Sequence, residues 1–136
     1  MSEAGEYAPI AEYAAIGDSR SVALVSRAGS IDWLCMPRFD STSTFAAILD
    51  RRRGGRFAIR PRGAYEATRR YLPDTNVLET SFTTADGTVR LTDAMTVGHT
   101  RQASDVDWPR QEVLRTAEGV DGQVELEVVC EPRPDY

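Results

Sequence analysis

Short apolar segments, separated by turn residues at hairpin spacing, are the feature that most limits what this chain can fold into. The segment SVALVS (residues 21–26) is followed by RAGS, in which Gly29 is free to adopt a left-handed turn, and then by the strand-like IDWLC. Asp86-Gly87 is a strong hairpin signal between LETSFTT and TVRLTDAM. The other strand-like runs are RFAIRP, AYEATRRYL, QEVLRTAEGV and QVELEVVCE. The pattern predicts a mainly β chain that forms an antiparallel β-sandwich, or part of one.

The last two of these runs are predicted to pair with each other around Asp121-Gly122. In the second run Val124, Leu126 and Val128 alternate with polar residues. This period of two predicts a strand with one buried face and one solvent-facing side. The sequence then ends in CEPRPDY, directly after a strong strand, as a cut through a larger sheet would.

The chain length of 136 residues is that of one ordinary domain, and a hydrophobic content of 41% is enough for a core. We expect residues 1–10 to be a flexible N-terminus and residues 11–136 to form one β-sandwich domain that is truncated at its C-terminal end. A polar stretch from Gly98 to Pro109 is expected to be a loop. It carries the single histidine, His99, which we expect to be solvated rather than a base or a ligand.

One segment is predicted to be helical. In TSTFAAILD (residues 42–50), Phe45, Ile48 and Leu49 fall on one helical face. The RRRGG that follows places cations and then glycine where a helix would end. The candidate N-caps are Asp40, Ser41 and Ser43. The expected fold is therefore a β-sandwich with one short helix.

Charge and motif content exclude several functions. The net charge of −5 argues against nonspecific nucleic-acid binding, and because all 16 basic residues are arginine there is no lysine-based catalysis. No apolar run resembles a signal peptide or is long enough to span a membrane, so we expect a cytoplasmic protein with no membrane partner. GxSxG, HExxH, CxxC and Walker or Rossmann glycine motifs are all missing, and nothing predicts a metal or a cofactor.

The cysteines and the arginine run have plain structural explanations. Cys35 and Cys130 are expected to be two buried, reduced thiols rather than a disulfide. The run Arg51 to Arg53 is either an anion site or, more simply, a solvated basic run at a helix end.

The aspartates are the only candidates for hydrolytic chemistry, because glycoside hydrolysis uses two carboxyl groups across a sugar. Most of them stand where turns or caps favour aspartate. Asp32 and Asp40 are the exceptions, since they flank the aromatic cluster in SIDWLCMPRFDS (residues 30–41).

The segment IGDSRSVALVSRAGSIDWLCMPRFDSTSTFAAILD resembles the start of the bacterial and archaeal glucoamylases and trehalases of glycoside hydrolase family 15. The resemblance continues through GGRFAIRP, RRYLPDTNVLETSFTTADGTVRLTDAM and the last strands, and covers the chain from about Ala11 to its end. Met36 departs from the pattern, because an aromatic residue is common there in the family.

The resemblance implies that this region is an N-terminal β-sandwich domain, here a partial supersandwich. It would precede a catalytic (α/α)6 barrel in which two glutamates hydrolyse α-glucosidic bonds with inversion. Neither glutamate is expected among these residues, so we expect no catalytic residue in this chain. The implied partner is the barrel of the same parent chain, with sugar as a second candidate.

Within this resemblance, the hypothesis for the loop is that Trp33, Arg38, Phe39 and Asp40 lie at the boundary between sandwich and barrel, near the substrate entrance. Arg38 would pair with Asp40 or with a carboxylate of the barrel. The competing interpretation is that Ile31, Trp33 and Phe39 pack the core, Pro37 stiffens the turn and Asp40 caps the helix.

Two functions stay open at this point. The first is a non-catalytic domain that packs on and shapes the barrel of an inverting hydrolase of trehalose or malto-oligosaccharides. The second is a stand-alone carbohydrate-binding or interaction module without catalysis. Exposed aromatic residues and a saturable sugar affinity would favour the second function.

Overall fold

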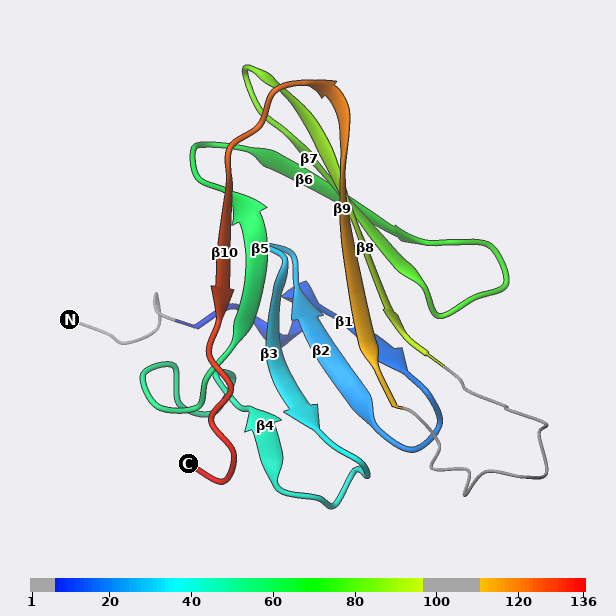
Figure 1. Ribbon diagram of the computed structural model, residues 1–136, viewed down its shortest axis with the longest axis vertical. Coiled ribbons are helices and arrows are strands. Elements are labelled where there is room, and N and C mark those ends of the chain that lie inside the picture. Colours follow the sequence, from blue (N-terminus) through cyan, green and yellow to red (C-terminus); the bar gives the residue numbers. More distant parts are fainter. Residues whose placement is uncertain (1–6, 97–110) are drawn as a thin grey trace, which may run out of the picture.

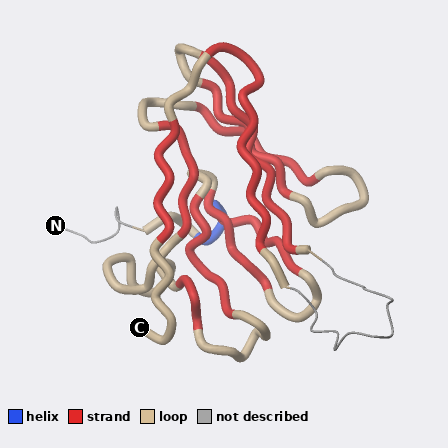
Figure 2. Tube along the Cα trace, viewed as in Figure 1, coloured by secondary structure: helices blue, strands red, loops and turns tan. Residues whose placement is uncertain are grey.

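The computed structural model describes residues 7–96 and 111–136, which form two antiparallel β-sheets (Figures 1 and 2). In chain order the elements are the 3-10 helix η2 (Ile10–Glu12) and the strands β1 (Tyr13–Gly17), β2 (Val22–Ser26), β3 (Ser30–Cys35), β4 (Ser43–Phe45), β5 (Phe57–Pro61), β6 (Glu66–Tyr71), β7 (Leu78–Thr83), β8 (Gly87–Met95), β9 (Val113–Gly122) and β10 (Leu126–Cys130). The predicted class, an antiparallel β-sandwich, is confirmed.

The two sheets differ in size and in the order of their strands. The first has the order β1-β2-β3-β5-β10, with β4 paired to β3, and the second has the order β6-β7-β8-β9. Figure 1 shows β10, β5, β3 and β2 in one layer and β9, β8, β7 and β6 in the other. The edges of the sandwich are therefore β1 and β10 in the first sheet, and β6 and β9 in the second.

Two of the three hairpins predicted from turn residues are confirmed. Strands β2 and β3 pair antiparallel, and Gly29 in their turn has a φ of 73°. A side chain there would also be blocked, because a Cβ on Gly29 would lie 2.2 Å from the carbonyl oxygen of Ile59. Strands β7 and β8 pair across the turn that holds Asp86, where the N–H of Thr84 donates to the carbonyl of Gly87 at 2.8 Å.

The helix predicted at residues 42–50 is wrong. Its first part is strand β4, and turns follow; among the described residues the one helical segment is η2. The backbone finds partners outside the segment, since the N–H groups of Ala46 and Ala47 donate to the carbonyls of Gly54 and Gly55 at 2.8 and 3.1 Å. These bonds use donors that an α-helix would have directed to the preceding turn.

The predicted pairing of the last two strands is also wrong. Strand β9 pairs with β8, whereas β10 crosses to the first sheet and pairs with β5. The crossing begins at Gly122, which has a φ of 61°, and the N–H of the next residue donates to the carbonyl of Asp86 at 3.2 Å. The two strands thus close two different sheets instead of forming a hairpin.

The core lies between the sheets as two apolar clusters. The first contains Ile16, Ala23, Val25, Ile31, Leu34, Phe45, Leu78 and Met95, and the second contains Ile59, Phe82, Val89 and Leu91. Val124 and Leu126 are partly buried against the second cluster, as their alternation predicts. Val128, predicted to be buried with them, is instead 61% exposed.

Several expectations fall on residues outside the described part of the chain. These are His99, the rest of the loop before residue 111 and most of the expected flexible N-terminus. In the described ranges, 7–96 and 111–136, no helix is long and apolar enough to cross a membrane.

Candidate functional site

The candidate loop is a tight turn that follows β3 directly. After Cys35 the chain passes through a cis peptide bond between Met36 and Pro37. Two hydrogen bonds between Arg38 and Ser41 close the turn. The N–H of Ser41 donates to the carbonyl of Arg38 at 3.1 Å, and the N–H of Arg38 donates to the hydroxyl of Ser41 at 3.0 Å. The loop therefore presents its side chains from a fixed backbone.

Arg38 and Asp40 form a two-pronged ion pair at the tip of this turn. Nε of Arg38 donates to Oδ1 of Asp40 at 3.0 Å, and Nη2 donates to Oδ2 at 2.7 Å. One of the two expected partners of Arg38 is thus observed, and Asp40 caps no helix. The two side chains are 69% and 70% exposed, so water screens the pair and it contributes about 0–1 kcal/mol to folding.

The three residues that the packing interpretation assigns to the core differ in burial. Ile31 is fully buried in the core, as the packing interpretation predicts. Phe39 is 59% exposed, so that interpretation is wrong for this residue. Trp33 is half-buried on β3 and belongs to neither core cluster. The structure therefore brings Arg38, Phe39 and Asp40 together in one exposed turn and leaves Trp33 on the strand before it.

The turn between β1 and β2 holds the loop in place. The N–H of Phe39 donates to the carbonyl of Arg20 at 2.9 Å, and the hydroxyl of Ser21 donates to the carbonyl of Cys35. Both contacts join the backbone of the loop to the β1–β2 turn. The loop therefore cannot move relative to that turn without breaking these hydrogen bonds.

Asp18 organises that neighbouring turn. Its Oδ1 accepts from the N–H groups of Arg20 and Ser21, both at 2.9 Å, and its Oδ2 accepts from the side-chain amide of Gln111 at 2.6 Å. Burial acts to raise the pKa of Asp18, but these donors outweigh burial and hold the pKa below its ordinary value. Because Gln111 lies just before β9, with only Glu112 between them, Asp18 also ties the first sheet to the start of the second sheet's edge strand.

A second polar cluster lies beside β3 and lines a cavity of about 90 Å³. The hydroxyls of Tyr13 and Ser30 donate to the two carboxylate oxygens of Asp32 at 2.6 and 2.5 Å. Burial, followed by the bond to Asp32 and its charge, raises the pKa of Tyr13 above the ordinary value. Four arginines also line this cavity, Arg27, Arg51, Arg56 and Arg60.

Only one member of the arginine run belongs to this cavity. Arg51 lines it, whereas Arg53 pairs with Asp50 at 3.0 Å and is exposed. Of the residues around this cavity, the sequence singled out Asp32 and, within the arginine run, Arg51. Ser30 and Asp32 lie two positions apart on β3, and residues with this spacing share one face of a strand. That spacing was the signal in the sequence for this cluster.

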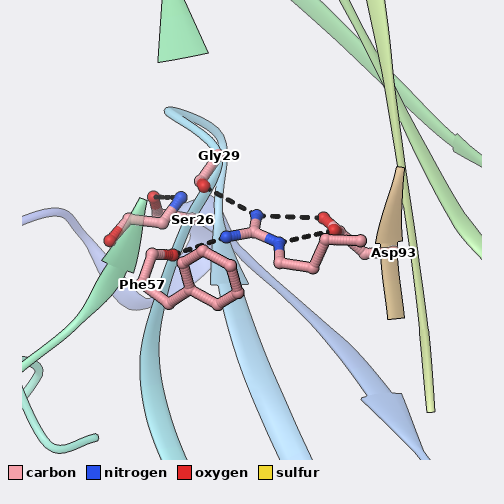
Figure 3. A network of polar contacts seen from close by, with 6 residues as sticks. Ser26, Gly29, Phe57 and Asp93 are labelled. Carbon is pink, nitrogen blue, oxygen red and sulfur yellow. Dashed lines mark hydrogen bonds and ion pairs between the residues drawn. The ribbon is translucent and has the colours of Figure 1, made fainter. Parts of the chain in front are cut away.

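A third polar group, missed in the sequence, is buried between the sheets (Figure 3). Nε and Nη2 of Arg115 donate to Asp93 at 2.7 and 3.2 Å. The guanidinium also donates to the carbonyls of Phe57 and Gly29 at 2.5 and 2.7 Å, and lies 4.8 Å from the centre of the Phe57 ring. Burial raises the pKa of Asp93, and the bonds and charge of Arg115 oppose that rise. The sequence does carry a signal for this group. Asp93 falls on the same face of the alternating strand β8 as Val89, Leu91 and Met95, all of which are buried.

The two cysteines are both free, as expected, but only one is buried. Cys35 is buried, and burial raises the pKa of its thiol. Cys130 is exposed, so the expectation of two buried thiols is wrong for this residue. Within the part of the chain that the structure describes, no three His, Cys, Asp or Glu side chains come together as metal ligands would.

Comparison with known proteins assigns the chain to a family. Residues 3–136 match the family model of the trehalase-like N-terminal domain, and the chain belongs to this family. It is 41% identical over 141 residues to a trehalase of Mycolicibacterium smegmatis and 40% identical to a trehalase of Mycobacterium tuberculosis. Each alignment covers 96% of this chain but only 21% of the relative.

Other relatives match a shorter part of the chain. A trehalase of Thermoplasma volcanium is 40% identical over 92 residues, which cover 65% of this chain and 15% of that protein. No solved structure gives a significant match.

Proposed function

We propose that this chain is the non-catalytic N-terminal domain of an inverting glycoside hydrolase of family 15, which acts on trehalose or malto-oligosaccharides. The observation that carries the proposal is the match of residues 3–136 to the trehalase-like N-terminal domain. In addition, the aligned region makes up only 21% of the length of the Mycolicibacterium smegmatis trehalase. In the proposal, a helical-barrel catalytic domain of the same parent chain supplies the acid and the base.

The path of the C-terminal residues supports a role for the Arg38–Asp40 turn at a domain boundary. The N–H groups of Arg133 and Asp135 donate to the carbonyls of Thr44 and Ser43 at 2.9 and 3.2 Å. These bonds hold the last residues beside β4, the strand that follows the turn in the sequence. Polypeptide that continued past residue 136 in a longer parent chain would leave the sandwich next to this turn.

The chemistry of the turn fits a surface that faces the catalytic domain or the entrance to its substrate pocket. Phe39 offers flat apolar surface, and a sugar or an apolar side chain packs well on such a face. The ion pair beside it fixes the charges of Arg38 and Asp40 and leaves outward-facing hydrogen-bonding capacity for hydroxyls or backbone groups.

The test is to purify the protein at its natural length from its source cells, determine its mass and measure glucose release from trehalose and from maltose. A mass several times 15.0 kDa together with glucose release supports the proposal. A natural product of 15.0 kDa, or a larger one that releases no glucose from either sugar, contradicts it.

A further inference from the structure

The cavity of about 90 Å³ beside β3 has no part in the proposed function. Its volume equals that of roughly three water molecules, whereas pockets for drug-sized ligands occupy about 300–1,000 Å³. A disaccharide is therefore too large for this cavity, and only a molecule of a few heavy atoms fits. The charges and the hydrogen-bond donors of its wall indicate which kind of molecule that is.

One arginine of the wall has no acceptor for its guanidinium. Nε of Arg27 lies 3.4 Å from Oε2 of Glu12, and Nε of Arg60 lies 3.5 Å from Oε2 of Glu127. Arg56 differs from these two arginines. It is half-buried, and its guanidinium forms no ion pair or hydrogen bond with the residues that the structure describes. The cavity therefore has a rigid fork of N–H donors with nothing to accept from it.

A buried hydroxyl on the same wall is a second donor without an acceptor. Ser26 is 4% exposed, and its Oγ accepts from the N–H of Ser30 at 3.2 Å. Within residues 7–96 and 111–136, nothing accepts the hydroxyl hydrogen of Ser26 in return. The neighbouring hydroxyls of Tyr13 and Ser30 already donate to Asp32. A cation and a buried hydroxyl that both lack an acceptor are satisfied together by a small anion.

The rest of the lining favours an organic anion over an inorganic one. Three alanines, Ala8, Ala28 and Ala47, line the cavity. A phosphate or sulfate ion carries oxygen atoms on every side, and some of them would lie unpaired against these methyl groups. The carboxylate of Asp32 on the wall also repels a dianion more strongly than a monoanion. A carboxylate that carries a short hydrocarbon group avoids both costs.

We propose that this cavity is a binding site for a small organic monocarboxylate, such as acetate or lactate. Arg56 and Ser26 donate to the carboxylate oxygens, and the hydrocarbon end packs against the alanines. The segment before β1 closes one part of the wall, because the N–H of Arg51 donates to the hydroxyl of Tyr7 at 3.3 Å. The site lies within this chain and does not depend on the proposed function.

The test is a calorimetric titration of the natural-length protein with sodium acetate at constant ionic strength. We expect saturable binding with a Kd of about 1 mM, because so small a ligand makes few contacts. Acetamide has the same shape without the charge, and it should bind at least about tenfold more weakly. The inference is overturned if acetate shows no saturable binding or if acetamide binds as tightly.

A matched pair of arginine variants locates the site. Arg56→Met removes the donor in the cavity, and Arg52→Met removes an exposed arginine that does not line it. We expect Arg56→Met to weaken acetate binding at least about tenfold and Arg52→Met to leave it unchanged. The melting temperature without acetate shows whether each variant is folded. A folded Arg56→Met variant with unchanged affinity overturns the inference.

A second pair of variants tests the site without removing a charge, and it serves even if Arg56→Met does not fold. Ala28→Leu fills the cavity from a half-buried position, whereas Ala85→Leu adds the same side chain in the exposed turn between β7 and β8. We expect saturable acetate binding to be lost in the first variant and kept in the second. Equal binding in both overturns the inference.

Inorganic phosphate distinguishes a carboxylate site from a site for any oxyanion. We expect phosphate to bind at least about tenfold more weakly than acetate at the same ionic strength, because of the methyl groups and Asp32. Phosphate that binds as tightly as acetate and is lost in Arg56→Met overturns the inference. These titrations do not use turnover, so their failure leaves the proposed function standing. A protein that releases no glucose but binds acetate contradicts the proposed function alone.

Discussion

Arg115 of β9 and Asp93 of β8 form an ion pair buried between the two sheets, with side chains that are 1% and 0% exposed. The remaining donors of Arg115 reach the carbonyls of Gly29 and Phe57, so one side chain of the second sheet satisfies two backbone groups of the first (Figure 3). A buried charge is tolerated only when it is paired and hydrogen-bonded, and here both conditions are met.

Replacement of one partner of this pair should therefore be costly. We expect Arg115→Met to lower the free energy of unfolding by about 3–5 kcal/mol, because it leaves the buried Asp93 carboxylate without its charged partner and removes the Arg115 donors from the carbonyls of Phe57 and Gly29. Urea unfolding followed by tryptophan fluorescence measures the change. Arg62→Met is the control, because Arg62 pairs with Glu125 on the surface at 2.9 Å and should cost less than about 1 kcal/mol. Equal losses in the two variants would contradict the assigned role.

The turn between β2 and β3 should tolerate no side chain at Gly29. Its φ of 73° and the Cβ approach of 2.2 Å to the Ile59 carbonyl predict that Gly29→Ala destabilises the protein by more than about 1 kcal/mol. Gly63→Ala is the matched control, because a Cβ there meets nothing within 4 Å. We expect that variant to be neutral or slightly more stable in thermal unfolding. A tolerated Gly29→Ala would mean that the turn differs from the one described.

The Arg38–Asp40 turn should matter to activity more than to stability. Under the proposed function, Arg38→Ala and Asp40→Ala in the natural-length protein should each lower the turnover of trehalose or maltose at least about tenfold. The melting temperature should change little, because the pair is exposed and contributes about 0–1 kcal/mol. Ser81→Ala, on the distant strand β7, serves as a control for both measurements. A fall in melting temperature with unchanged turnover would assign the turn to folding instead.

Asp18 should make the protein sensitive to acid. Its pKa is lowered in the folded state, so its contribution to stability is present above the ordinary value of 3.8 and is lost as the pH falls through the lowered folded value. We expect Asp18→Asn to be less stable than the wild type at neutral pH, and the difference to shrink as the pH falls below 3.8. Urea unfolding at a series of pH values measures it. A difference that stays constant over this range would show that the carboxylate charge is not responsible.

Local signals predicted the parts of the fold that depend on neighbours in the sequence. The turn residue Gly29 and the dipeptide Asp86-Gly87 were sufficient for two hairpins, because each acts on the strands beside it. In the candidate site the pairing of Arg38 with Asp40 was foreseen for the same reason, since the two residues are separated by one position. The apolar and polar alternation was equally sufficient for the sandwich class.

The rest was decided by partners that lie far away in the sequence. The apolar spacing of residues 42–50 fits a helix. Its backbone instead pairs with strand β3 and donates hydrogen bonds to the carbonyls of Gly54 and Gly55. Strand β9 joins β8 and β10 joins β5, because each completes a different sheet edge against the shared core. The burial of Asp93 beside Arg115 and the exposure of Val128 and Cys130 follow from that division. Sequence periodicity by itself determined which residues alternate between two faces, and only the tertiary structure decided which of those faces is covered, because burial depends on what packs across the sheet.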